Sequence, residues 1–319
     1  MSRLAQGTGG DGSFCGLVGD HPRMLALRDA MRRAAGLDTP VVVCGPTGAG
    51  KELVARALHR LSACAEGPFC PVNVAALPES LLESEVFGST RGAFTGAVAD
   101  RLGLAETAHG GTLFLDEAGE LPPPTQAKLL RVLDSGEVRR VGATQATRAC
   151  FRLIAAVQEE PCALLRGGRW RQDFFYRVTG VVLRVPALRE HSEDVEPIAR
   201  AFLASRGLHG LQPDAVPLLE IQPWPGNVRE LQHVLVRAAF HAHGATIGRA
   251  HLLAALGDAA VGSAAEEPQS LHAVRHHHVR QTVQACEGDT RRAAALLGIS
   301  RAHVYRLLRS DAATVLDAG

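Results

Sequence analysis

The chain has 319 residues, 46% of them hydrophobic and 21% charged, so it is long enough for two or three globular units with sizeable cores. Its formal net charge of +1 excludes a uniformly basic coating protein but leaves room for a locally basic DNA-binding segment. The sequence has no run of about 18 apolar residues and no CxxC pair among its seven cysteines, which predicts a cytoplasmic protein with reduced thiols and no membrane span.

The predicted elements divide the chain into five segments. Residues 1–16 are Gly-rich and polar, and we expect them to be disordered. Residues 17–186 alternate short apolar runs with helical patterns, which predicts an α/β subdomain with a largely parallel sheet. Helical periodicity alone continues over residues 187–256, and a low-complexity linker at 257–270 precedes a small helical unit at 271–319. The expected buried strands are residues 41–44, 70–74, 112–115 and 153–157.

The first expected strand is followed by the glycine-rich segment GPTGAGKE at residues 45–52. Glycines allow successive backbone N–H groups to converge on phosphate oxygens, the following helix presents its N-terminus, and Lys51 reaches the β- and γ-phosphates. The preceding strand and the amphipathic pattern after Lys51 favour a P-loop over an ordinary glycine-rich turn. The general motif has Ser or Thr after the lysine to bind Mg²⁺, where this chain has Glu52. The predicted nucleotide-binding residues are Gly45, Pro46, Thr47, Gly48, Ala49, Gly50, Lys51 and Glu52.

About sixty residues later, the segment GGTLFLDE at residues 110–117 is an apolar strand that ends in two acids. We expect Asp116 to hold Mg²⁺ through water and Glu117 to polarise the attacking water during hydrolysis. Two acids after a strand are more often a solvated strand end. Their place behind a P-loop predicts an ATPase that uses ATP and Mg²⁺.

The hexapeptide GAFTGA at residues 92–97 gives the chain a specific family resemblance. Over residues 17 to about 310, the sequence resembles the bacterial enhancer-binding proteins, the AAA+ activators of sigma-54 RNA polymerase. That family usually has GESGTGKE where this chain has GPTGAGKE, so Glu52 is normal for it. The segments PFCPVNVAAL, RWRQDFFYR and WPGNVREL match further motifs of the family. The resemblance implies an α/β AAA+ P-loop NTPase core, an α-helical lid and a C-terminal all-α Fis-type helix-turn-helix.

The resemblance also implies individual roles. Asn73 resembles the switch asparagine that holds the catalytic Glu117 until the γ-phosphate is sensed, and Arg229 resembles the sensor II arginine of the lid. Arg171 and Arg177 resemble the two arginine fingers that reach a neighbouring subunit's nucleotide. A finger supplied in trans makes catalysis depend on a homo-oligomeric ring, which in this family is a hexamer.

Two further features concern the coupling of hydrolysis to the polymerase. The resemblance implies that the GAFTGA loop contacts sigma-54 and moves with nucleotide state; its residues are Gly92, Ala93, Phe94, Thr95, Gly96 and Ala97. An exposed Phe94 would serve as a contact, and the alternative is a hairpin turn with Phe94 in the core. The family's sensor I segment reads IAATN, whereas this chain has Val157 and Gln158 at its end. The longer Gln side chain shifts the amide donor, so we expect altered coupling.

The C-terminal segment 289–309 has the pattern of a helix-turn-helix. Gly298 ends one predicted helix and Ser300 caps the next. Residues 271–310 contain seven arginines and two acidic residues, a net charge of +5, so the basic charge lies at this end. Arg301, His303 and Arg306 are expected at base edges in the major groove, and Arg291 and Arg292 at phosphates. The alternative is a plain helical hairpin.

These predictions describe a receiver-less activator, resembling the phage-shock and Hrp kinds, that binds enhancer DNA and remodels sigma-54 RNA polymerase holoenzyme. Either a regulatory protein acting in trans or the activator's own expression would control it. One rival is an AAA+ remodeller that does not touch polymerase, and the other is a non-catalytic DNA-binding regulator with a degenerate ATPase domain. Consecutive residues 276–278 are all His but point around a helix, which disfavours a metal site, and Lys128 receives no role.

Overall fold

The computed structural model describes residues 14–93 and 99–263, together with residues 290, 292 and 294. The chain separates into two compact units, residues 1–256 and 257–319. Within the first unit, the expected disorder of residues 1–16 is wrong at its end. Phe14 is 2% exposed and pairs with Leu17 through a short antiparallel bridge, because its ring packs into the core beside helix α1 (Pro22–Ala35).

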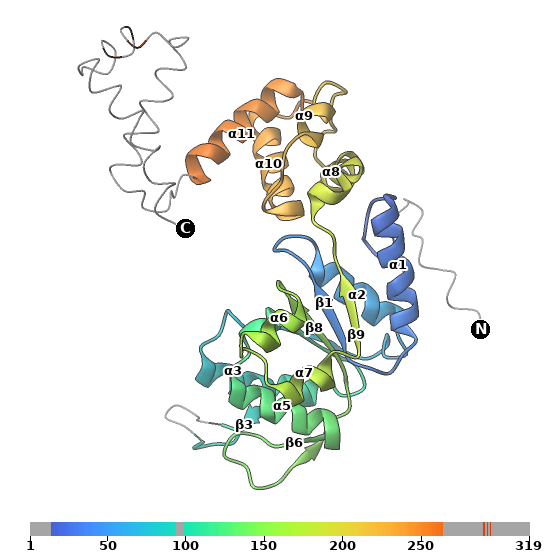
Figure 1. Ribbon diagram of the computed structural model, residues 1–319, viewed down its shortest axis with the longest axis vertical. Helices are drawn as coiled ribbons and strands as arrows, with labels where there is room; N and C mark the ends of the chain where they lie inside the picture. The colour runs from blue at the N-terminus through green and yellow to red at the C-terminus, as the bar shows by residue number, and fades with distance from the viewer. Residues whose placement is uncertain (1–13, 94–98, 264–289, 291, 293, 295–319) are drawn as a thin grey trace, which may run out of the picture. The chain divides into compact units, whose positions relative to one another are not determined.

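A five-stranded sheet forms the centre of residues 17–186 (Figure 1). Its strand order is β2-β5-β8-β1-β9, and all four neighbouring pairs are parallel. The prediction of an α/β subdomain with a largely parallel sheet is therefore confirmed. The five strands are β1 (Val41–Cys44), β2 (Phe69–Asn73), β5 (Thr112–Asp116), β8 (Arg152–Val157) and β9 (Val181–Arg184).

Four of these strands match the predicted ranges to within one residue, and β9 was not predicted. β9 lies at the edge of the sheet beside β1, and only one of its four residues, Leu183, is buried. Such a half-exposed edge strand lacks the continuous apolar run that marks the buried parallel strands.

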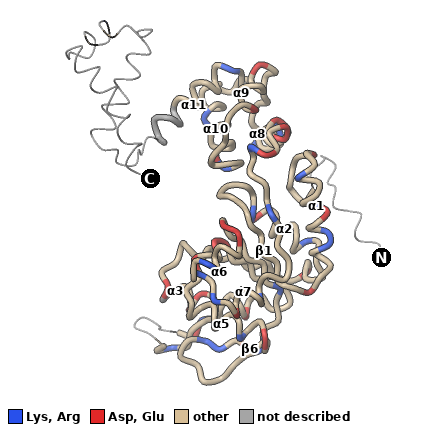
Figure 2. Tube along the Cα trace, viewed as in Figure 1, with Lys and Arg blue, Asp and Glu red and all other residues tan. Residues whose placement is uncertain are grey.

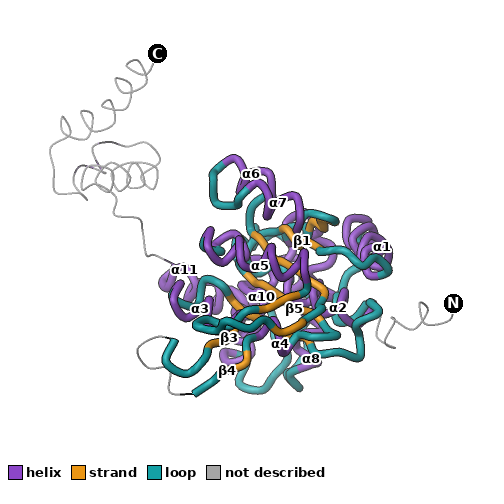
Figure 3. Tube along the Cα trace, turned by 90° about the horizontal axis from the view of Figure 1, so that it is seen from below, coloured by secondary structure: helices purple, strands orange, loops and turns teal. Residues whose placement is uncertain are grey.

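Helices cover both faces of the sheet, as Figure 3 shows from below. Successive side chains of a strand point to opposite faces, so Val41 and Val43 pack with α1 and α2 (Lys51–Leu61), whereas Val42 packs with the other layer. That other layer is built mainly by α3 (Glu79–Phe87), α5 (Pro123–Ser135) and α7 (Gln172–Val178). The shorter elements are β3 (Gly88–Ser89), β4 (Arg101–Leu102), α4 (Leu104–Thr107), η1 (Ala118–Glu120), β6 (Glu137–Val138), β7 (Thr147–Arg148) and α6 (Pro161–Arg166).

The predicted helical segment from residue 187 is a helical subdomain with its own apolar core. Trp224 and Leu235 are almost completely buried in that core, which the amphipathic α8 and α10 supply on their inward faces. Its elements are η2 (Leu188–Asp194), α8 (Val195–Ser205), α9 (Val216–Glu220), α10 (Asn227–His241) and α11 (Arg249–Ser263).

α11 ends later than predicted. It continues to Ser263, so the first seven residues of the expected linker 257–270 are helical, and that part of the prediction is wrong. Ala and Leu dominate the helix, and such good helix formers outweigh the glycines within it. The rest of the predicted linker lies outside the described residues.

Charged residues of both signs are spread over the described trace, and neither sign is confined to one element (Figure 2). Within residues 14–93 and 99–263, no helix is long and apolar enough to cross a membrane.

Candidate functional site: a phosphate-binding loop between the sheet and the lid

The predicted P-loop connects β1 to α2 at the carboxyl edge of the sheet. The Gly45 N–H donates to the Val157 oxygen at 3.1 Å, which joins the start of the loop to β8. Gly48 and Gly50 have φ values of +76° and +95°, which a residue with a Cβ rarely adopts. No side chain caps the N-terminus of α2, so its first N–H groups point into the loop, where an anion would be bound.

Lys51, the first residue of α2, is buried within the loop. Its Nζ donates to the Gly45 oxygen at 2.8 Å and to the Pro46 oxygen at 3.1 Å. Burial lowers the pKa of Lys51, while the negative charges of Asp116 and Glu117 oppose that shift. Both acids are therefore close enough to act electrostatically on the ammonium group. The P-loop and the acidic strand end thus contribute to one site.

The two acids lie where β5 ends. Asp116 Oδ1 accepts a hydrogen bond from the Glu117 N–H at 3.1 Å. Glu117 has a φ of +54°, an uncommon conformation for a residue with a side chain and one found at functional sites. A carboxylate at this strand end, across from a phosphate-binding loop, fits Mg²⁺ bound through water, since Mg²⁺ prefers oxygen ligands and keeps most of its waters.

Of the two amide side chains expected near Glu117, Gln158 contacts it and Asn73 does not. Gln158 follows β8, and its Nε2 donates to Glu117 Oε1 at 3.4 Å, so the longer side chain does reach the acid. Asn73 pairs with Asp116 in the strand register, but its Oδ1 accepts from the Ala76 N–H at 3.1 Å. Among the described residues, therefore, Gln158 contacts the catalytic candidate and Asn73 caps its own turn.

The lid reaches the P-loop through the start of α10. The Arg229 N–H donates to the Gly48 oxygen at 3.3 Å, and the charge of Arg229 contributes to the lowered pKa of Lys51. Glu52 points elsewhere: Arg56 pairs with its carboxylate at 2.7 Å on the exposed face of α2. The structure thus brings Lys51, Asp116, Glu117 and Arg229 together and leaves Glu52 outside the cluster.

An apolar cavity of about 330 Å³ opens beside the P-loop, between the N-terminal turn (residues 14–21), α2 and the lid. No motif of the sequence pointed to this cavity. Leu53, in the first turn of α2, is 42% exposed and lines it. Other lining residues are Leu17, Val18, His191, Ile198 and Val228.

Asp194 joins the lid to the N-terminal turn at this cavity. Its Oδ1 accepts from the N–H groups of Asp20 and His21 at 2.8 and 3.2 Å. Its Oδ2 lies 3.1 Å from Nδ1 of His191, whose pKa is lowered by burial. A Cβ atom at Gly19 would overlap the Asp194 carboxylate, so this close approach requires glycine.

Arg171 and Arg177 lie at opposite ends of α7, and both are paired with acids of the same chain. Arg171 makes two hydrogen bonds to Asp173, at 3.0 and 2.7 Å, and they lower the pKa of the Asp173 carboxyl to about 2. Arg177 binds Asp134 at 3.0 Å and also donates to the Leu133 oxygen. Both guanidinium groups are nearly half exposed, and in the described part of the chain neither contacts the P-loop.

Gln126 was not singled out from sequence, yet it fixes the backbone of Arg171. This fully buried residue of α5 accepts from the Arg171 N–H at 2.9 Å and donates to the Arg169 and Leu121 oxygens at 2.6 and 2.8 Å. Leu121 follows the acidic strand end, so one amide links that region to α7. A glutamine at a buried position of α5, beside the apolar Leu129 and Val132, was the available signal.

The GAFTGA loop is described only at its base. Gly92 and Ala93 are described, whereas Phe94, Thr95, Gly96 and Ala97 lie outside the described residues. The alternative positions predicted for Phe94, exposed or in the core, are therefore not tested. The two ends of the loop are joined because the Arg91 N–H donates to Asp100 at 2.8 Å. The Thr90 N–H and hydroxyl both donate to the Val141 oxygen, at 3.0 and 3.2 Å, which fastens the base to the loop after β6.

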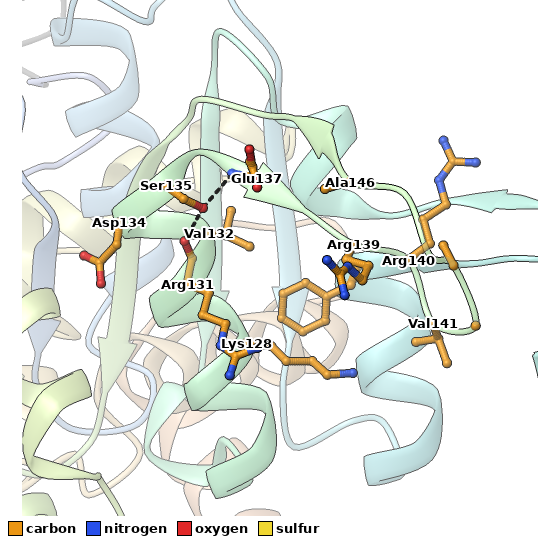
Figure 4. A pocket seen from close by; sticks show the side chains of 13 residues that line it. Lys128, Arg131, Val132, Asp134, Ser135, Glu137, Arg139, Arg140, Val141 and Ala146 are labelled. Carbon is orange, nitrogen blue, oxygen red and sulfur yellow. Dashed lines mark hydrogen bonds between the residues drawn. The ribbon is translucent and has the colours of Figure 1, made fainter.

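The loop after β6 borders a separate cavity of about 480 Å³ beside α5 (Figure 4). Figure 4 shows Lys128, Arg131, Arg139 and Arg140 around it, from the helix and from the loop. Arg140 makes two hydrogen bonds to the largely buried Glu106, at 2.7 and 2.9 Å, and so anchors the loop to α4. Lys128 forms an ion pair with Glu83 of α3, which gives this lysine a structural partner.

The predicted DNA-binding residues fall almost entirely outside the described part of the second unit. Arg291, Ser300, Arg301, His303 and Arg306 lie outside it, as do the three consecutive histidines. Arg292 is described, in a helical position with an exposed side chain. The helix-turn-helix therefore stays a prediction.

Comparison with known proteins agrees with this geometry. A family described as the sigma-54 interaction domain matches residues 17–184, and one described as an AAA+ ATPase lid domain matches residues 189–269. The Nif-specific regulatory protein of Azotobacter vinelandii is 45% identical over 238 residues, which cover 73% of this chain and 46% of that protein. The transcriptional regulatory protein ZraR of Klebsiella oxytoca is 41% identical over 295 residues, 90% of this chain and 67% of ZraR.

One solved structure with a similar fold is that of NtrX. The crystal structure of NtrX from Brucella abortus in complex with ATP matches with a TM-score of 0.69 and 32% identity, over 92% of this chain and 69% of NtrX. The chain thus spans about half to two thirds of the length of these relatives. The first matched range contains the P-loop and the acidic strand end, and the second covers most of the helical lid. The chain belongs to the family of sigma-54-dependent enhancer-binding proteins, with an AAA+ core and lid.

Proposed function

We propose that this protein hydrolyses ATP to remodel a closed sigma-54 RNA polymerase complex into an open one. The observation that carries the proposal is the cluster of Lys51, Asp116, Glu117 and Arg229 around the P-loop, inside a segment that belongs to the sigma-54 interaction domain family. In this cluster, Lys51 and the loop N–H groups bind the phosphates, and Glu117 orients the attacking water.

The cofactors are ATP and Mg²⁺. Asp116 holds Mg²⁺ through water, and the metal when bound neutralises charge on the transferred phosphoryl group. The apolar cavity beside the P-loop has the size and lining to take an adenine ring, with Leu53 and Val228 on its walls. ATP bound to NtrX, a relative at 32% identity, supports this choice of nucleotide.

Ring formation supplies what one chain lacks. Arg171 and Arg177 are exposed, and they would act on the nucleotide of a neighbouring subunit in a homo-oligomer, which we propose to be a hexamer. Within the ring, the loop at residues 92–97 contacts sigma-54, and its base is braced by Val141. The segment 271–319 binds enhancer DNA as a helix-turn-helix, through the residues predicted above. Contact with RNA polymerase would place the protein in the cytoplasm.

Transcription in vitro with sigma-54 holoenzyme on a supercoiled promoter tests the proposal. We expect open complexes with ATP and none with ATP omitted or replaced by a non-hydrolysable analogue. Phe94→Ala should keep ATPase activity and lose open-complex formation. ATP-independent activation, or full transcription by Phe94→Ala, would contradict the proposal, and ATP hydrolysis without any effect on polymerase would favour a different AAA+ remodeller.

A further inference from the structure

We propose that Asn227 is a positioning residue that fastens the lid to the P-loop and thereby sets where Arg229 stands at the phosphate site. The proposal rests on the nucleotide binding proposed above. Asn227 is the first residue of α10, two positions before Arg229, and it is 3% exposed. Its φ of +53° is one that asparagine and glycine adopt more readily than other residues.

Both ends of the Asn227 amide bind backbone groups of other segments. Oδ1 accepts from the Leu188 N–H at 2.9 Å, and Leu188 is the first residue of η2, near the start of the lid. Nδ2 donates to the Thr47 oxygen at 2.8 Å, inside the P-loop, and lies 3.3 Å from the Pro225 oxygen. One side chain therefore joins the entry of the lid, the start of α10 and the phosphate-binding loop.

The backbones around this amide are in direct contact. A Cβ atom at Gly48 would overlap the Gly226 oxygen, and the Arg229 N–H donates to the Gly48 oxygen at 3.3 Å. Thr47 and Gly48 thus face the turn that begins α10 at two successive positions. A displacement of the P-loop when phosphate binds would be passed to α10, and so to Arg229, through these contacts.

The chemistry of the side chain distinguishes positioning from simple filling of space. An apolar residue of this size would leave the Thr47 oxygen and the Leu188 N–H unpaired in a buried place, which is costly. An amide satisfies a donor and an acceptor at once, and no other residue of this length does so. Asn227→Asp keeps an acceptor for Leu188 but replaces the donor to Thr47 with an oxygen. Asn227→Gly removes the whole amide and tolerates the backbone conformation.

The experiment measures ATPase kinetics of the full chain for these two variants. We expect each to raise the KM for ATP by about tenfold, the effect of one buried hydrogen bond, with a smaller change in kcat. Asn227→Asp should be at least as impaired as Asn227→Gly, although it retains the bond to Leu188. The matched control is Gln222→Ala, because the Gln222 amide donates to the Leu218 oxygen within the lid, at 3.2 Å, and its KM should match the wild type.

A double-mutant cycle with Arg229→Ala tests whether Asn227 acts through that arginine. If it does, the KM of the double variant Asn227→Gly/Arg229→Ala should exceed the wild-type KM by much less than the product of the two single effects. Single effects that multiply in the double variant would overturn the proposal. So would Asn227 variants whose KM is normal but whose thermal midpoint is lower than that of Gln222→Ala, because Asn227 would then be only structural. If Asn227→Gly fails to fold, Asn227→Asp, which has the same shape, carries the same cycle. A wild-type chain without ATPase activity would refute the proposed function itself, whereas an active wild type with unaffected variants would refute only this inference.

Discussion

The positive charge of Lys51 is buried within the P-loop, whereas the charges of Arg171 and Arg177 are exposed at the ends of α7. The Lys51 ammonium is buried and bound to carbonyl oxygens of its own loop, with two acids and a lid arginine within electrostatic reach. The two arginines are nearly half exposed and paired with Asp173 and Asp134 on the other helical layer. The phosphate-binding residues thus gather within one chain, whereas Arg171 and Arg177 lie exposed and paired elsewhere, as their proposed role at a neighbouring subunit's nucleotide requires.

The free energies of these interactions also differ between buried Lys51 and the exposed Arg171 and Arg177. Ion pairs at exposed positions contribute little to stability, so Arg171 and Arg177 can exchange their partners at small cost. The buried hydrogen bonds of Lys51 are exchanged only for something equally polar, such as a phosphate. Gln126 holds the backbone of Arg171 in place while leaving its side chain accessible.

The largest expected effect tests the exposed arginines. Arg171→Ala should lower ATPase activity by roughly 10³-fold, the lower end of the range for an arginine finger, without weakening nucleotide binding by its own subunit. Mixing Arg171→Ala with Lys51→Ala subunits should restore part of the activity, because some interfaces then combine an intact P-loop with an intact arginine. Steady-state phosphate release measures both.

The control for this experiment is Arg166→Ala, which removes an exposed arginine of the neighbouring α6. It should leave the rate unchanged. A mixture that assembles into rings and stays inactive would break the comparison, since the arginine would then serve its own subunit.

A second prediction concerns the phosphate-binding site. Glu117→Gln should lower hydrolysis by about 10²-fold, the loss typical of a missing general base, and should leave ATP affinity within a few fold because the side chain keeps its size. Phosphate release reports the first quantity, and titration with a fluorescent ATP analogue the second. Glu120→Gln, an exposed acid three residues later, is the matched control and should behave as wild type. Unchanged hydrolysis in Glu117→Gln would remove this residue from the site.

The smallest expected effect sharpens the role of Gln158. Gln158→Asn shortens the side chain that donates to Glu117 at 3.4 Å, and losing one such bond should change kcat by about fivefold or less. The effect should vanish in a Glu117→Ala background, where the acceptor of this hydrogen bond is absent. A change of equal size in that background would show that Gln158 acts elsewhere.

How much the sequence could predict depended on whether the signal was local. β1 was predicted residue for residue, because four consecutive buried apolar residues before a glycine-rich loop leave few alternatives. β9 was missed because an edge strand with half-exposed valines carries no such run. The P-loop and the acidic strand end were likewise readable as local motifs.

The contacts that fix the site could not be predicted in this way. Asn227 stands in a quoted motif, yet its partners Thr47 and Leu188 are 180 and 39 residues away, so only the folded chain reveals its hydrogen bonds. Glu52 belongs to the predicted P-loop, but its carboxylate pairs with Arg56 on the exposed face of α2. Leu53 lines the apolar cavity together with residues of the lid, a contact that no local pattern indicates.

The close approach of Gly19 to Asp194 has a consequence for building chimaeras from relatives of this protein. A lid grafted after Pro186 would carry Asp194 with it. The Asp194 carboxylate would then fit only a recipient protein that has glycine at position 19. The N-terminal turn and the lid are thus a single exchangeable module, although about 170 residues of other sequence separate them. A crossover that keeps a glycine at position 19 preserves this contact, whereas one that places a side chain there opposite Asp194 would force the two segments apart.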